Sequence, residues 1–288
     1  MSIPMETITS DDDLTQAGFY WREIDGVRAL VCAPLEQDGF VNGFSTRLGG
    51  VSDMPQNALS LAGFNDDRAE NILENRRRFL KLFPGDWALA GCWQVHGADV
   101  RVVESAAEAK PAENERGDTI YCDAILSGAH GVLAGVKTAD CVPILVGDPK
   151  TGAFAAVHAG WRGTLAEIGM VAVKRLAAEY KAEPHDLRVA IGASAGPCCY
   201  EVGMDVIEAF TSKFPDSAAL FTPTKPGHAL VDLLKSNRDQ LIAAGVTEER
   251  IHTAPLCTMC RTDLFFSYRR EKSMNGKVGR LMAVIGKK

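Results

Sequence analysis

The chain has 288 residues and a formal net charge of −6; 46% of its residues are hydrophobic and 24% are charged. These values are ordinary for a globular protein, and the acidic balance argues against a broad surface for nucleic acid. No apolar run approaches the ~18 residues of a membrane span, and the N-terminus lacks the features of a secretory signal, so we expect a cytoplasmic protein without nucleic-acid or membrane partners.

Residues 1–17 are predicted to form a loose leader, and one domain is expected over residues 18–288. In the first half, one helical pattern covers residues 66–83, and residues 107–117 form a polar connector. The stripe of this helix consists of Ile72, Leu73, Phe79, Leu80 and Phe83. Strand-like runs cover residues 27–34, 40–46, 87–97, 98–104, 119–126 and 131–136.

The second half begins with a β-hairpin, because two apolar runs, 142–146 and 153–157, flank the turn sequence GDPKTG. A helix is predicted over residues 164–180, opened by a capping box of Thr164 and Glu167. Further elements are a strand at 187–193, a helix entered through 196–203, a helix at 231–245 closed by Gly245, and strands at 263–270 and 279–286. This mixture without strict βαβ alternation indicates an α+β fold, with helices packed outside mixed, largely antiparallel sheets.

The hairpin brings a cysteine and a histidine together. If Val146 pairs with Ala153, Cys141 lies directly opposite His158, and opposed residues share a face with Cβ atoms roughly 5 Å apart. A thiolate and an imidazole at that spacing can hold one metal ion or act as nucleophile and base. The sequence leaves both alternatives open.

His96, in the stretch WQVHGAD, extends the pair to a His/Cys/His set, although on its own it reads as an ordinary half-buried histidine. Three protein ligands with one open position are typical of catalytic zinc, whereas closed structural sites use four. Zinc lowers the pKa of a bound water to about 7. His96, Cys141 and His158 are therefore a candidate metal site, with a Cys-His nucleophile pair as the open alternative. Asp140 is expected to face away from the metal and either to fix the loop or to contact a metal ligand from outside.

Two arginines are candidate anion ligands. Arg162 is expected just before a helix N-terminus, where free N–H groups favour phosphate or carboxylate, or else as a surface arginine stacked on Trp161. Arg47 lies in the glycine-rich loop STRLGGVS, which allows close approach of a ligand but also reads as a plain turn.

The remaining cysteine motifs are weaker. The CxxC at residues 257–260 has no partner CxxC or histidine pair in sequence, and we interpret it as buried thiols. Cys198 and Cys199 are interpreted as packing residues, with Cys198 as a candidate for the pocket lining. The HxE and PCxxC pattern of zinc deaminases, the P-loop and the GxGxxG fingerprint are absent. Six histidines are too few for a multicopper oxidase.

Taken together, the motifs FSTRLGGVS, QVHG, TADCVPIL, AVHAGWRGT, GPCCYEVG and LFFSYRR…GR resemble the YfiH-like family. That family is variously called laccase-domain protein, polyphenol oxidase, peptidoglycan editing factor and purine nucleoside phosphorylase. The motifs span residues 44–280 in the expected order. Departures from the family pattern are the segment 270–280 and Ala193, which bear on substrate preference.

The resemblance implies an α/β sandwich, sometimes grouped with cysteine hydrolases, and a zinc or copper site at His96, Cys141 and His158. It further implies phosphorolysis of purine nucleosides, including methylthioadenosine, and deamination of adenosine. Cys141, His158 and Arg162 would then be catalytic, and Arg47 and Arg162 would bind substrate or phosphate. The alternatives are a Cys141-dependent hydrolase acting on a cell-wall precursor, a copper-dependent phenol oxidase and a non-catalytic metal-stabilised binding module.

Overall fold

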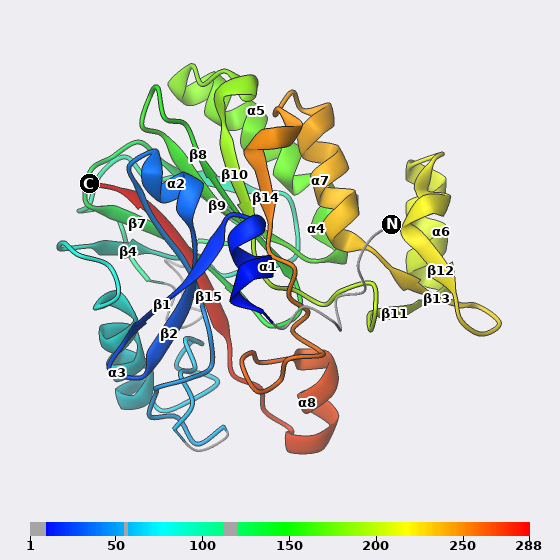
Figure 1. The fold of residues 1–288 in the computed structure, drawn as a ribbon, viewed down its shortest axis with the longest axis horizontal. Helices are drawn as coiled ribbons and strands as arrows, with labels where there is room; N and C mark the ends of the chain where they lie inside the picture. The colour runs from blue at the N-terminus through cyan, green and yellow to red at the C-terminus, as the bar shows by residue number, and fades with distance from the viewer. Residues whose placement is uncertain (1–9, 55–56, 112–119) are drawn as a thin grey trace.

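The structure, a computed structural model, describes residues 10–54, 57–111 and 120–288. Two six-stranded sheets dominate it (Figure 1). The first has the order β1 (Phe19–Ile24), β2 (Val27–Cys32), β3 (Phe40–Ser45), β15 (Leu281–Lys287), β7 (Val132–Thr138), β4 (Ala88–Ala90). The second has the order β14 (Ile251–Thr253), β10 (Arg188–Ile191), β8 (Val142–Gly147), β9 (Phe154–Ala159), β6 (Ala124–Ser127), β5 (Val100–Val102).

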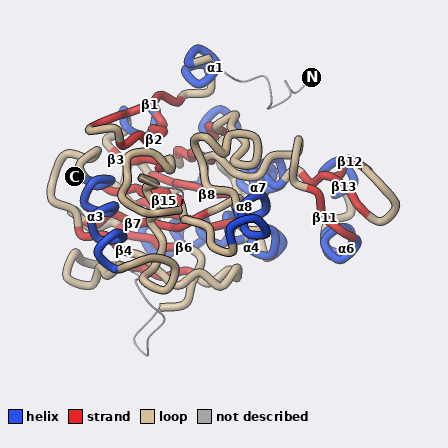
Figure 2. Tube along the Cα trace, turned by 90° about the horizontal axis from the view of Figure 1, so that it is seen from below, coloured by secondary structure: helices blue, strands red, loops and turns tan. Residues whose placement is uncertain are grey.

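A small third sheet, β11 (Glu201–Gly203), β13 (His228–Val231) and β12 (Phe221–Pro223), lies to one side together with α6 (Met204–Lys213) (Figure 2). The other helices are α1 (Asp11–Gln16), α2 (Ala33–Gln37), α3 (Ala69–Leu80), α4 (Trp161–Leu165), α5 (Ile168–Tyr180), α7 (Leu233–Ala243) and α8 (Tyr268–Asn275). None of the helices in the described ranges is both long enough and apolar enough to cross a bilayer.

The two large sheets pack face to face, with β15 and β7 lying against β8 and β9. Strand β15 is apolar at successive positions because both of its faces are buried. Ala283 and Ile285 face the core between the sheets, whereas Met282 and Val284 face α3 on the outside. Helices α5 and α7 cover the outer face of the second sheet. Most strand pairs are antiparallel, and the parallel ones are β10–β14, β4–β7 and β5–β6. The predicted α/β sandwich is therefore confirmed.

The predicted hairpin is present with a different register. Pro143, not Cys141, pairs with His158, and Val142 pairs with Ala159. Asp148 builds a tighter turn than expected, since its backbone N–H bonds to Ala153 O at 2.8 Å and its carboxylate accepts from Lys150 N and Thr151 Oγ1. The shift is two residues, so Cys141 and His158 stay on the same face.

The prediction of one helix over residues 164–180 is wrong, because the helical segment begins earlier and consists of two helices. Helix α4 begins at Trp161, and Glu167, with a φ of 60°, separates it from α5. The capping box does not form, because Thr164 Oγ1 accepts from Asn237 Nδ2 of α7 and Glu167 pairs with Lys213. Tertiary contacts thus replace the local cap.

Three further expectations differ from the structure. Residues 263–270 are not a strand; Ser267 instead caps α8 by accepting from Arg270 N. Residues 11–16 of the expected loose leader form α1, while residues 1–9 lie outside the described part. Leu73 of the predicted apolar stripe is 52% exposed. The connector predicted at 107–117 falls partly outside the described residues.

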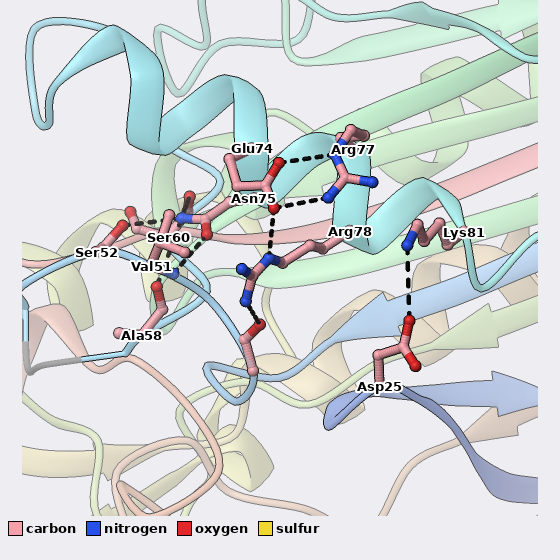
Figure 3. A network of polar contacts seen from close by, with 11 residues as sticks. Asp25, Val51, Ser52, Ala58, Ser60, Glu74, Asn75, Arg77, Arg78 and Lys81 are labelled. Atoms are coloured by element: carbon pink, nitrogen blue, oxygen red, sulfur yellow. Dashed lines mark hydrogen bonds and ion pairs between the residues drawn. The ribbon is translucent and has the colours of Figure 1, made fainter.

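Helix α3 fixes the loop that carries Val51, Ser52 and Ser60 (Figure 3). Asn75 is fully buried, and its side chain bonds to Val51 N at 2.9 Å, Ser52 Oγ at 2.8 Å and Ser60 O at 2.9 Å. Ser60 Oγ in turn accepts from the backbone N–H of Arg280 at 3.3 Å. The network therefore connects α3 to the segment that carries Arg280.

Candidate metal centre and its cavity

Three predicted ligands meet at one end of the intersheet core. Cys141 lies just before β8, His158 lies in β9, and His96 comes from the loop between β4 and β5. One ligand atom from each lies within 4.8 Å of the other two. The two imidazole rings are nearly perpendicular, with centroids 4.9 Å apart. The structure thus brings together the whole His/Cys/His set.

Glycine makes this approach feasible. Gly160 stands across the hairpin from Cys141, and a Cβ atom there would lie 2.9 Å from His96 Cδ2 and 3.0 Å from Cys141 Sγ. Any larger residue would push the ligands apart, so the glycine of the HAGWRG motif leaves the space that the site occupies.

Asp140 has the loop-fixing role that the sequence predicted. It adopts a left-handed φ of 85°, which is unfavourable for a non-glycine residue. Its carboxylate accepts from Thr258 Oγ1 at 2.6 Å, Ser267 Oγ at 3.0 Å and Arg269 N at 2.7 Å. These bonds hold the strained residue immediately before Cys141.

Asp123 is an organising residue that the sequence analysis missed. Its fully buried carboxylate lies 2.8 Å from His158 Nδ1 and accepts the backbone N–H groups of His96 at 2.9 Å and Gly97 at 2.7 Å. It therefore orients the imidazole of His158, fixes the backbone of His96, and leaves Nε2 of His158 for the ligand position. An acidic residue inside the apolar run TIYCDAIL was the available signal.

The charges of the site favour a thiolate. Burial alone would raise the pKa of Cys141, but the His158 and His96 imidazoles outweigh it and lower this pKa to about 6. Burial alone would lower the pKa of His158, but Cys141 and Asp123 raise it to about 9. Burial likewise opposes ionisation of Asp123, yet its bonds from His158 and Gly97 lower its pKa. Without metal, these charges favour a thiolate and an imidazolium over the neutral pair.

A cavity of about 460 Å³ opens onto the three ligands, within the size range of small-molecule sites. Two aromatic side chains, Trp93 and Tyr268, and two cationic ones, Lys137 and Arg280, line it together with Asp66. The Arg280 guanidinium carbon lies 5.7 Å from the Tyr268 ring centroid, and Lys137 Nζ lies 5.8 Å from that of Trp93. Burial lowers the pKa of Lys137 to about 8.

The predicted anion-binding arginines lie outside this lining. Arg47 is buried, pairs with Glu271 at 2.9 Å and donates to Thr262 O at 2.7 Å, so its contacts are structural and give no support to substrate binding. Arg162 is exposed and stacks on Trp161 at 4.1 Å, in a second hollow of about 340 Å³. It lies in the first turn of α4 and not before it.

Comparison with known proteins places the chain in a family. "Purine nucleoside phosphorylase YlmD" of Geobacillus stearothermophilus is 36% identical over 263 residues, 90% of this chain and 94% of that protein. The crystal structure of YlmD from Geobacillus stearothermophilus matches with a TM-score of 0.83 at 34% identity, covering 92% of this chain and 97% of that chain. The crystal structure of the Bacillus licheniformis hypothetical protein YfiH matches with a TM-score of 0.84 at 27% identity, covering 93% of this chain and 99% of that chain.

The family model described as multi-copper polyphenol oxidoreductase laccase matches residues 41–288. That range includes all three candidate ligands and the whole cavity lining. The chain therefore belongs to this YfiH-like laccase-domain family.

Proposed function

We propose that the protein is a zinc-dependent purine nucleoside phosphorylase. The observation that carries the proposal is the composition of one cavity, in which a His/Cys/His ligand set lies beside two cations and two aromatic rings. The relatives named as purine nucleoside phosphorylases supply the substrate class.

The ligand set fits a zinc ion. Tetrahedral bonds of about 2.0–2.3 Å to nitrogen and sulfur place the donor atoms about 3.3–3.8 Å apart, and the donors here lie within 4.8 Å. Two imidazoles and one thiolate suit zinc, with copper as the alternative. His96, Cys141 and His158 would hold the ion, which supplies Lewis-acid polarisation at this end of the cavity when bound.

The cavity residues bind the two substrates. Trp93 and Tyr268 offer faces on which a purine ring stacks, and Arg280 and Lys137 attract phosphate by charge. Phosphorolysis breaks the bond between C1′ of the ribose and the purine nitrogen and forms a bond from C1′ to a phosphate oxygen. Holding both reactants in one enclosed cavity supplies the orientation that this displacement needs.

The proposed substrates are inosine, guanosine, adenosine and methylthioadenosine. For adenosine we also propose hydrolytic deamination, in which water replaces the amino group at C6 and ammonia leaves. The same cavity would hold the nucleoside for both reactions. For deamination, the purine base would lie at the end of the cavity that the metal ligands line.

Base release from inosine, measured with and without phosphate, tests the proposal. We expect hypoxanthine and ribose 1-phosphate in equal amounts, only when phosphate is present, together with zinc in the purified protein. Arg280→Ala should raise the KM for phosphate, whereas Arg162→Ala, outside the cavity, should leave it within twofold. Absence of base release from all purine nucleosides contradicts the proposal.

The lowered pKa of Cys141 supports a second candidate, a hydrolase in which this thiolate attacks an amide or ester such as a cell-wall precursor. Stoichiometric alkylation of Cys141 at neutral pH in protein as purified, without bound metal, would favour it.

The phenol-oxidase alternative has less support. Within the described residues, no group of side chains that could hold a metal ion contains more than two histidines. A binding module that holds a ligand without turnover would show tight binding but no products.

A further inference from the structure

Four cysteines from two distant segments gather in a second cluster. Their Sγ atoms all lie within 4.8 Å of one another. We call this group the four-cysteine cluster; it consists of Cys198, Cys199, Cys257 and Cys260. It shares no residue with the His/Cys/His set, and the sequence analysis interpreted its two halves separately as packing residues and buried thiols.

Local turns bring the four sulfurs together. Residues 197–199 form a turn in which Cys199 N and Tyr200 N both bond to Gly196 O at 3.0 Å. The side chains of Cys198 and Cys199 therefore do not point to opposite sides, as adjacent side chains do in a strand. Residues 257–260 form another turn, closed by Arg261 N bonding to Cys257 O at 3.0 Å. A bridge between Ser194 and Cys257 aligns the two segments.

The sulfur separations match a tetrahedral metal site. Zinc–sulfur bonds of about 2.3 Å place the sulfurs of a four-thiolate site about 3.8 Å apart. Cys260 Sγ lies 3.5 Å from Cys198 Sγ and 3.2 Å from Cys199 Sγ, and the longest separation in the cluster is no more than 4.8 Å. Small side-chain rotations therefore suffice to bring four sulfurs to one ion.

Two contacts of the cluster would stabilise metal-bound thiolate sulfur. The backbone N–H of Gly196 donates to Cys257 Sγ at 3.2 Å, and Arg270 Nη2 lies 3.8 Å from Cys199 Sγ. Hydrogen bonds to coordinated sulfur and a nearby cation are the outer contacts that stabilise such sites. Cys257 is buried, whereas the other three are half-buried, so an ion can reach the cluster from solvent.

We propose that the four-cysteine cluster binds a second zinc ion as a closed, structural site. Binding of Zn²⁺ by four thiols releases four protons and leaves a net charge of −2, which Arg270 partly offsets. No redox step is involved, and the ion is held without an open position for substrate.

The cluster also connects to the first site. Thr258, between the two cysteines of the CxxC, donates to Asp140 Oδ1 at 2.6 Å, and Ala195 N donates to Asp140 O at 2.8 Å. Asp140 holds its left-handed φ directly before Cys141. A zinc ion that clamps residues 194–199 to 257–260 would therefore stabilise the backbone that presents Cys141.

Metal counting on the full-length protein, purified under reducing conditions, tests the proposal. We expect two zinc ions per chain in the wild type and one in the Cys257→Ser/Cys260→Ser variant. His96→Ala/His158→Ala should also retain one ion, and Cys32→Ala, at a buried cysteine outside both clusters, should retain two. These counts do not depend on any nucleoside activity, so failure of the proposed phosphorylase would leave them unchanged.

Cobalt substitution provides a second measurement that needs no cysteine variant. The His96→Ala/His158→Ala protein loaded with Co²⁺ should retain intense sulfur-to-cobalt absorption, because four of the five thiolate bonds in the two sites belong to the cluster. The proposal is overturned if the Cys257→Ser/Cys260→Ser variant holds as many zinc ions as the wild type, or if the His96→Ala/His158→Ala variant lacks the thiolate absorption. A loss of two hydrogens per cysteine pair in the intact mass, without a second metal, would likewise overturn it in favour of disulfides.

Discussion

The carboxylate oxygen Oδ1 of Asp123 lies 2.8 Å from Nδ1 of His158 and also accepts the backbone N–H of His96 at 2.9 Å. One buried side chain thus fixes the orientation of one imidazole and the backbone of another. The two ligands come from elements far apart in the sequence, so their geometry depends on this residue more than on local structure.

Asp123→Asn should lower metal affinity by about 10- to 100-fold. The amide has one acceptor oxygen in place of two, and its NH₂ group faces either the backbone donor of His96 on the Oδ1 side or that of Gly97 on the Oδ2 side. A competition titration with a chromophoric chelator measures the change. Asp148→Asn is the matched control, because Asp148 is equally buried but lies at the far turn of the hairpin; unchanged affinity in Asp123→Asn, or an equal loss in the control, contradicts the assignment.

Gly160→Ala should abolish metal binding at the first site while the fold is retained. The φ of Gly160 is −68°, so alanine is acceptable to the backbone and the effect comes from contact with His96 and Cys141. Far-ultraviolet circular dichroism and metal analysis separate the two effects. Gly97→Ala is the control, since a Cβ there meets its nearest atom at 3.6 Å; a fully metallated Gly160→Ala protein would show that the ligands are placed differently.

Asn75→Ala should lower the free energy of unfolding by about 3 kcal/mol, because it leaves buried groups of Val51, Ser52 and Ser60 without their partner. It should also raise the KM for phosphate, since Ser60 contacts the backbone of Arg280. Urea denaturation and kinetics measure the two effects. Arg77→Ala, which removes an exposed ion pair of the same helix, should change neither.

The layers of the fold were predictable because the apolar patterns of β8, β9, α5 and β15 show that these elements are buried. That burial does not depend on which residues pair across the strands. The contact between Cys141 and His158 was predictable for the same reason. An error of two residues in the register keeps both side chains on one face, so the face was right although the predicted direct pairing was wrong.

Other features depend on contacts between distant segments. Asn237 and Lys213 replace the cap expected from Thr164 and Glu167, and Glu271 engages Arg47. None of these three partners is visible from the local motif. The four-cysteine cluster was missed for the same reason, because its halves are about 60 residues apart in sequence and each half alone is a weak signal.

Alkylation of Cys141 in metal-free protein should follow a midpoint near pH 6. Burial alone would raise the pKa of Cys141, but the His158 and His96 imidazoles lower it from its usual 9.0 to about 6, so the reactive thiolate forms as the pH rises through 6. Iodoacetamide labelling followed by peptide mass spectrometry gives the rate. His158→Asn should move the midpoint towards 9, and added zinc should protect the thiol; a wild-type midpoint above 8 would contradict the described charge pair.

Lys137 should make phosphate binding sensitive to alkaline pH. Burial lowers its pKa to about 8, so the ammonium that attracts phosphate is present below pH 8 and is lost as the pH rises through this value. We expect the KM for phosphate to rise between pH 7 and 9.5 in the wild type. In Lys137→Arg the guanidinium keeps its charge over this range, so the rise should disappear; the ionisation of phosphate itself is common to both proteins and cancels in the comparison. If both proteins show the same rise, Lys137 does not supply the charge that binds phosphate, and Arg280 alone remains as the cationic partner in the cavity.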